Sequence, residues 1–70
     1  MIGLKQSKRA LEQNEVKEAY VAYDADASVI GDFVRQCGAR RVQINKEHTM
    51  AQLGKAAGID IGAAVIAVLK

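Results

Sequence analysis

The sequence TMAQLGKAAGIDIGAAVIAVL, at residues 49–69, contains in succession the signals of a helix, a turn and a strand. Thr49 and Gln52 have the spacing of a capping box, which marks the start of a helix. Apolar residues then share one face of that helix, at Met50, Leu53 and Ala57. Gly58 is expected to end the helix, and the apolar run at residues 63–69 is typical of a strand covered on both faces. This succession favours an α/β fold.

The rest of the chain repeats the alternation of helix and strand patterns. Residues 5–13 are rich in helix formers, and residues 18–23 have the β-branched and aromatic character of a strand. Asp26 is a candidate cap for a helix with one apolar face, at Val29, Ile30, Phe33, Val34 and Cys37. Gly38 is expected to end that helix, and residues 41–44 alternate like a second strand. The predicted order is α-β-α-β-α-β, with helices around a mixed or mostly parallel sheet.

Length and composition indicate one small domain over residues 1–70, with no proline and no linker. The longest apolar run has seven residues, whereas a membrane-spanning helix needs roughly 20. No apolar run near the N-terminus is long enough for a signal peptide, and a single cysteine cannot form an internal disulfide. We therefore expect a cytoplasmic protein with no membrane partner.

The charges are unevenly distributed along the chain. Ten Lys and Arg residues face eight Asp and Glu residues. The first eleven residues carry three cations and no acid, and a second basic pair stands at Arg40 and Arg41. The acids fall mostly between Glu12 and Asp32. This pattern suggests a dipolar surface that suits a polyanion, although an ordinary mixed surface fits the same charges. Three aromatic residues and no tryptophan argue against binding by base stacking.

The residue types of active sites and metal sites are nearly missing from the sequence. Cys37 lies on the apolar helix face, where a buried, inert thiol is expected, and His48 is expected in a solvated loop. Asp24 and Asp26 fit a turn and a helix cap better than a catalytic carboxylate pair. We therefore expect no catalytic residue, no enzymatic activity, no cofactor and no metal.

The N-terminal segment, residues 3–9, has a different character. Gly3 precedes a helix whose first turn carries Lys5 and Gln6, with Arg9 one turn later. A helix N-terminus has free N–H groups and a partial positive charge that suit a phosphate. Glutamine can bind base edges, and lysine or arginine can bind guanine. A solvated helix face is the alternative interpretation.

A second candidate segment connects the last helix to the last strand. Ile59 and Ile61 flank Asp60 in this short connection. Exposed apolar residues in a loop indicate a partner. The alternative is that both isoleucines point into the core.

Together these segments resemble the kink-turn-binding ribosomal protein family, the large-subunit "L-seven-Ae" family, over essentially the whole chain. Residues 3–11 resemble the family's helix start, and residues 22–26 its Ala-x-Asp-x-Asp strand end. Residues 53–64 are similar to its Leu-Gly-Lys-Ala-(Ala/Cys)-Gly-Ile-(Glu/Asp)-Val-(Ala/Gly)-Ala-Ala signature. The likeness is strongest to short bacterial members. Leu4, Arg9 and Ala27 depart from the family pattern.

The resemblance implies a three-layer α/β/α sandwich with a mixed central sheet. It also implies recognition of a kink-turn, an RNA helix bent sharply beside tandem sheared G·A pairs. Gly3, Lys5 and Gln6 would lie against the G·A pairs, and Arg9 would meet guanine or phosphate. The loop Ile59-Asp60-Ile61 would pack on the extruded bases.

The expected partner is therefore structured RNA, such as a kink-turn of a ribosomal RNA or a riboswitch. The resemblance further implies a ribosome-associated protein that acts as a monomer. Because some members of the family bind proteins instead, a non-catalytic protein-interaction or regulatory module without direct RNA binding is the alternative.

Overall fold

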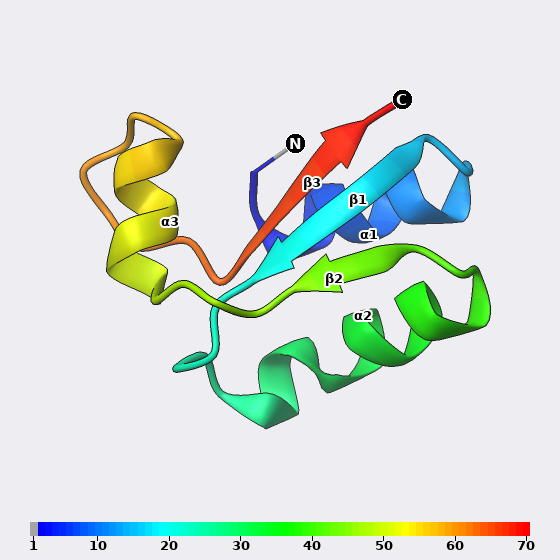
Figure 1. Ribbon diagram of the computed structural model, residues 1–70, viewed down its shortest axis with the longest axis horizontal. Coiled ribbons are helices and arrows are strands. Elements are labelled where there is room, and N and C mark those ends of the chain that lie inside the picture. Colours follow the sequence, from blue (N-terminus) through cyan, green and yellow to red (C-terminus); the bar gives the residue numbers. More distant parts are fainter. Residues whose placement is uncertain (1) are drawn as a thin grey trace.

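The fold is a small α/β fold in which helices and strands alternate along the chain (Figure 1). The computed structural model describes residues 2–70, so residue 1 of the predicted domain lies outside that range. The elements are α1 (Leu4–Glu12), β1 (Val16–Val21), α2 (Ala27–Ala39), β2 (Gln43–Asn45), α3 (Met50–Ala56) and β3 (Val65–Leu69). The predicted fold class and order, α-β-α-β-α-β, are confirmed. Within residues 2–70, no helix has the length and apolar character needed to cross a bilayer.

The sheet is mixed, with the strand order β2-β1-β3. Strand β1 is parallel to β2 and antiparallel to β3, and a register shift near its start disturbs the pairing at Lys17. Ile2 forms an isolated antiparallel bridge with Ile66 on the outer edge of β3. The Gly3 N–H donates to the Val65 carbonyl oxygen over 3.1 Å. These contacts fix the start of α1 beside the start of β3.

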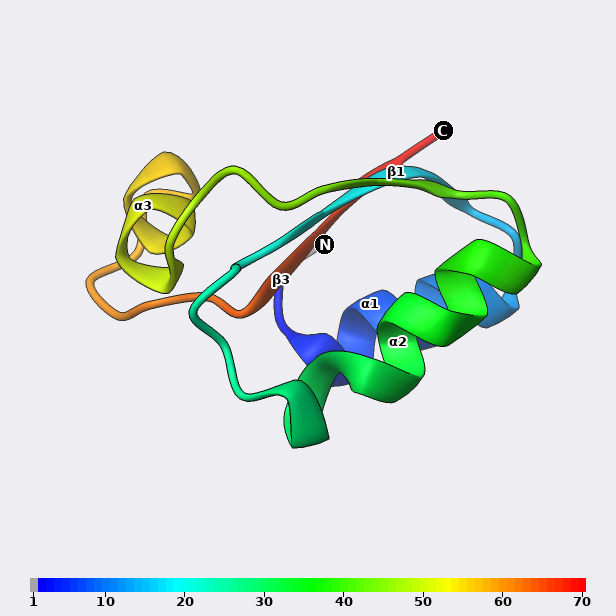
Figure 2. The same cartoon turned by 60° about the horizontal axis from the view of Figure 1, so that its bottom comes forward.

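Helices α1 and α2 lie side by side on one face of the sheet and enclose the main core (Figure 2). Alternation along each strand turns every second side chain to this face. The largest buried apolar side chains here are Leu11, Val21, Phe33, Cys37 and Val65. Each side chain of this size stabilises the fold by about 1.5–3 kcal/mol when buried. Between the two helices, the Lys8 ammonium and the Asp32 carboxylate form an ion pair at 2.6 Å.

The second outer layer consists of α3, which lies at one end of the sheet (Figure 2). Leu53 packs with Ala22 and Ala63 in a smaller apolar cluster there. A helix of seven residues is only about 10 Å long, so it covers one end of this face. Ile66 and Val68 on the same face of β3 stay half-exposed. The expectation that β3 is covered on both faces is therefore wrong along most of its length.

Helix α2 ends later than the glycine signal predicted. It continues through Gly38 to Ala39, and Arg41 then adopts the left-handed conformation with φ 59°. The Arg41 N–H donates to the Gly38 carbonyl oxygen, and the Val42 N–H donates to the Cys37 carbonyl oxygen. These two bonds form a Schellman motif, the usual ending of a helix. The predicted end at Gly38 is wrong because Arg41 adopts the conformation expected of that glycine.

Candidate nucleic-acid interface

The start of α1 presents backbone N–H groups that no side chain caps. Gly3 has a φ of 98°, which lets the chain turn from its bridge with β3 into the helix. No acidic residue stands in the first turn. The helix start therefore keeps the partial positive charge that favours an anion.

The side chains predicted to bind RNA on α1 are solvent-exposed. Lys5, Gln6 and Arg9 are exposed, whereas the opposite face of the helix is buried through Ala10 and Leu11. Gln6 and Arg9 also line the same shallow hollow along the helix. The sequence places three cations on this helix, Lys5, Lys8 and Arg9. One of them, Lys8, forms an ion pair with Asp32.

The loop at residues 59–61 turns one isoleucine inward and the other outward. Ile59 is half-buried and packs on the small cluster around Leu53. Ile61 is 74% exposed, and Asp60 is exposed beside it. The core interpretation therefore holds for Ile59 and is wrong for Ile61, whose contact with a partner stays a prediction.

The position of Ile59 follows from the way α3 ends. The Ile59 N–H donates to the Gly54 carbonyl oxygen, and the Gly58 N–H donates to the Lys55 carbonyl oxygen. This is a second Schellman motif, with Gly58 in the left-handed position at φ 76°. An apolar residue after that position packs back on the helix, as Ile59 does.

The same loop is held closely against α3. A Cβ atom at Gly54 would collide with the carbonyl oxygen of Ile61, and one at Gly62 would lie 3.2 Å from the Met50 Cβ. The Ala63 N–H also donates to the Met50 carbonyl oxygen over 3.0 Å. Gly54 and Gly62 therefore allow the loop and α3 to pack closely. The loop therefore presents Ile61 on a well-defined backbone.

Both candidate segments adjoin the start of β3. Gly3, ahead of α1, is bonded to Val65, while the loop enters β3 through Ala63 and Ala64. Five of the seven predicted site residues are exposed or half-exposed toward this end: Gly3, Lys5, Gln6, Asp60 and Ile61. Arg9 is also exposed but lies farther along, in the last turn of α1, and the half-buried Ile59 turns its side chain inward. We call this surface, made of Gly3, Lys5, Gln6, Arg9, Asp60 and Ile61, the candidate interface.

One aromatic ring at this end was missed by the sequence analysis. Tyr23 was predicted inside the first strand, but β1 ends at Val21 and the tyrosine is 62% exposed. The Tyr23 N–H donates to the His48 carbonyl oxygen, and the N–H of the preceding residue, Ala22, donates to the Ala64 carbonyl oxygen. One exposed aromatic ring therefore lies beside the start of β3, whereas the absence of base stacking stays a prediction.

The residues considered for chemistry have structural roles. Cys37 is fully buried, and this burial raises the pKa of its thiol. Asp26 caps α2 through the Ser28 N–H at 2.9 Å, and this bond lowers the pKa of the carboxyl. Asp24 accepts from the Met50 N–H at the start of α3 over 2.8 Å. Among residues 2–70, no group of three His, Cys, Asp or Glu side chains could hold a metal ion.

His48 lies in a loop as expected, but it is half-buried and not fully solvated. Its ring lies edge-on to Tyr20, with 6.1 Å between the ring centres, and its Nδ1 atom is buried. The reason is that α3 and the sheet end enclose the segment before the helix, which local polarity did not reveal. His48 thus lines the apolar hollow beside α3.

Comparison with known proteins agrees with this geometry. No protein-family model matches the chain. An RNA-binding protein of Halalkalibacterium halodurans is 41% identical over 70 residues, which are the whole chain and 85% of that protein. RNA-binding protein YbxF of Geobacillus stearothermophilus is 40% identical over the same shares. Among solved structures, the Giardia lamblia 15.5kD RNA binding protein superposes on the whole chain with a TM-score of 0.91. The chain covers 59% of that protein at 17% identity, so this match shows the shared fold.

Proposed function

This chain belongs to the family of small bacterial RNA-binding proteins that includes YbxF, and we propose that it binds kink-turn RNA. In this proposal the natural target is a kink-turn of a ribosomal RNA or a riboswitch, bound by a protein monomer. The protein acts by binding alone and catalyses no reaction. The names of its relatives support RNA as the partner, and the residues of the candidate interface support a kink-turn as the kind of RNA.

The observation that carries the proposal is the placement of two kinds of contact, one on the exposed face of α1 and one on the loop that leads into β3. Gln6 and Arg9 form a polar, hydrogen-bonding strip on α1, and Ile61 forms an apolar contact point on the loop. A kinked RNA offers the matching features, because its base edges are accessible at the bend and its extruded bases expose apolar faces. Lys5 and the uncapped N–H groups at the start of α1 are suited to the phosphates that lie between these base edges and the extruded bases.

A gel-shift titration tests the proposal directly. The probe is a simple kink-turn RNA, and its control is the same RNA with the tandem G·A pairs replaced by Watson–Crick pairs. We expect the kink-turn to bind at least about tenfold more tightly, which corresponds to about 1.4 kcal/mol. Equal affinity for the two RNAs would refute kink-turn recognition. No binding to either RNA would favour the protein-interaction module.

A further inference from the structure

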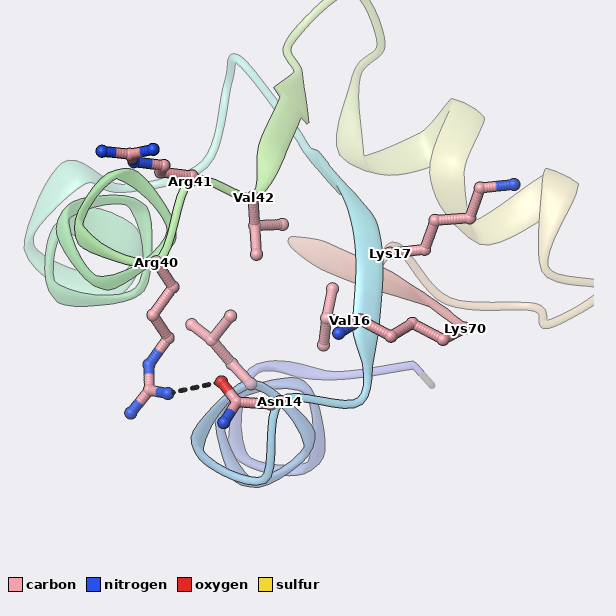
Figure 3. A pocket seen from close by; sticks show the side chains of 8 residues that line it. Asn14, Val16, Lys17, Arg40, Arg41, Val42 and Lys70 are labelled. Atoms are coloured by element: carbon pink, nitrogen blue, oxygen red, sulfur yellow. Dashed lines mark hydrogen bonds between the residues drawn. The ribbon is translucent and has the colours of Figure 1, made fainter.

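A second group of cations lies at the end of the sheet opposite the candidate interface. Strand β1 begins there, β3 ends there, and both α1 and α2 terminate there (Figure 1). A cavity of about 240 Å³ opens between these ends, and four cationic residues border it, Lys17, Arg40, Arg41 and Lys70. The charged ends of Lys17 and Arg41 point away from the cavity to the surface around it (Figure 3). The floor of the cavity is apolar, formed by Leu11, Val16 and Val42 (Figure 3). We call this surface the cationic end.

The charges of the cationic end have no partner within the described chain. No acidic side chain lines the cavity. The ion pairs of residues 2–70 use Lys8, Arg35 and Asp32, so they involve none of the four cations. The Arg40 Nη1 donates to the Asn14 Oδ1 over 2.9 Å (Figure 3), which orients the guanidinium without neutralising it. These cations therefore remain available to an external anion.

The backbone of Arg41 gives a second, independent indication. Each of the three helices ends in a Schellman motif, and the left-handed position is occupied by Asn14, Arg41 and Gly58 in turn. Glycine and asparagine are the usual residues there, whereas the conformation is unfavourable for arginine. The Arg41 side chain is exposed and points away from the cavity (Figure 3). Arg41 thus occupies a position where glycine would make the fold more stable. This indicates that the arginine serves an interaction with another molecule.

Attraction to the negative helix ends does not account for the two arginines. Cations near a helix C-terminus can bind its last carbonyl oxygens. In α2 these oxygens are bonded by backbone N–H groups, those of Arg40, Arg41 and Val42. The side-chain bond of Arg40 is directed to Asn14. Both guanidinium groups therefore keep donors for another acceptor.

We propose that the cationic end binds the sugar–phosphate backbone of an RNA segment that lies away from the kink. The inference rests on the proposed function, because it takes RNA as the partner. The longest axis of the molecule is 29 Å, and the loop of Ile61 and the cationic end lie toward its two ends, so they contact different parts of an RNA (Figure 1). Phosphate is the acceptor that suits exposed guanidinium groups without a base-reading side chain beside them. The protein then holds the kink at one end and a neighbouring RNA segment at the other.

The test compares a minimal kink-turn, the same kink-turn with both helices extended, and a plain duplex without a kink. The variants are Arg40→Ala, Arg41→Gly and their combination. Arg35→Ala is the matched control, because Arg35 is an exposed arginine of α2 that is paired with Asp32. Affinity is measured by titration at several salt concentrations. Thermal unfolding of each variant checks the fold, and Arg41→Gly should unfold at a higher temperature than the natural chain.

On the extended kink-turn, we expect the double variant to bind about tenfold or more weakly, with a log–log salt slope shallower by about 2. The minimal kink-turn should bind all variants equally, and Arg35→Ala should behave like the natural chain. Unchanged binding of the extended RNA, or an equal loss on both kink-turns, would overturn the inference. A different outcome separates the two proposals: replacing the G·A pairs leaves affinity unchanged, while the double variant binds the plain duplex more weakly. In that case kink-turn recognition is refuted, and RNA-backbone binding by the cationic end is supported.

Discussion

Ile59 and Ile61 are two residues apart in the chain, yet they contribute to different parts of the protein. The sequence places both in one short connection, but it leaves open which of them faces the core. The ending of α3 decides the question, because its Schellman motif turns Ile59 back onto Leu53 and leaves Ile61 outside. The exposed strip of Gln6 and Arg9, by contrast, could be predicted from helix periodicity alone.

Alanine substitutions separate the two isoleucines. Ile61→Ala should weaken kink-turn binding and change the free energy of unfolding by no more than about 0.5 kcal/mol, because the side chain is 74% exposed. Ile59→Ala should lower that free energy by about 1–3 kcal/mol, since it removes a half-buried contact with the α3 cluster. Urea unfolding and gel shifts measure both effects. A large loss of stability in Ile61→Ala would contradict the observed orientation.

Substitutions on α1 test the polar part of the candidate interface. Gln6→Ala and Arg9→Ala should each cost about 1–3 kcal/mol of kink-turn binding free energy if they contact bases. Both side chains are exposed, so the melting temperature should stay near that of the natural chain. Gln43→Ala is the matched control, because Gln43 is an exposed amide on β2. If Gln6→Ala and Arg9→Ala together leave affinity unchanged at moderate salt, α1 does not read the RNA.

At the scale of elements, helix starts were predictable and some ends were not. Asp26 and the Thr49–Gln52 box begin α2 and α3 as predicted, because a cap needs only side chains near in sequence. The end of α2 was missed because arginine replaces the expected glycine in the left-handed position. Strand β1 begins at Val16, earlier than predicted, since its partner at that point is Leu69 of β3. Such pairing between distant residues leaves no local signal.

The contact between α1 and α2 should depend on pH. The Lys8 ammonium and the Arg35 guanidinium each lie 2.6 Å from an Asp32 carboxylate oxygen, and they hold the pKa of Asp32 below its ordinary value of 3.8. A lowered pKa in the folded state stabilises the protein above pH 3.8, and this contribution is lost as the pH falls through the folded pKa.

Asp32→Asn should therefore melt at a lower temperature than the natural chain at neutral pH. The difference between the two proteins should shrink as the pH falls below 3.8, because the carboxylate then becomes neutral in both the folded and the unfolded state. Melting curves recorded from neutral pH down to about pH 2 measure this trend. A difference that stays constant over the whole series would show that the ion pairs do not account for it.

At the scale of the whole molecule, the order of layers was predictable and their extent was not. The apolar run at residues 63–69 suggested burial on both sides, but Val65 and Ala67 enter the core while Ile66 and Val68 lie on the open face. Apolar residues look alike in sequence whether or not a helix covers them. In the same way, the sequence identified the two segments of the candidate interface, but only the fold brings them together at the start of β3.

The distribution of free cations over the molecule sets the salt dependence of RNA binding. Each phosphate contact contributes roughly −0.7 to −0.9 to the log–log slope, so 3–5 contacts give roughly −2 to −4.5. At the candidate interface only Lys5 and Arg9 are free, because Lys8 is paired with Asp32. A minimal kink-turn should therefore show a slope near the shallow limit, about −2. An RNA long enough to reach Arg40 and Arg41 as well should have a slope steeper by about 2, near −4. Titrations from low to moderate salt measure both slopes, and affinity that is independent of salt for both RNAs would point to a protein partner instead.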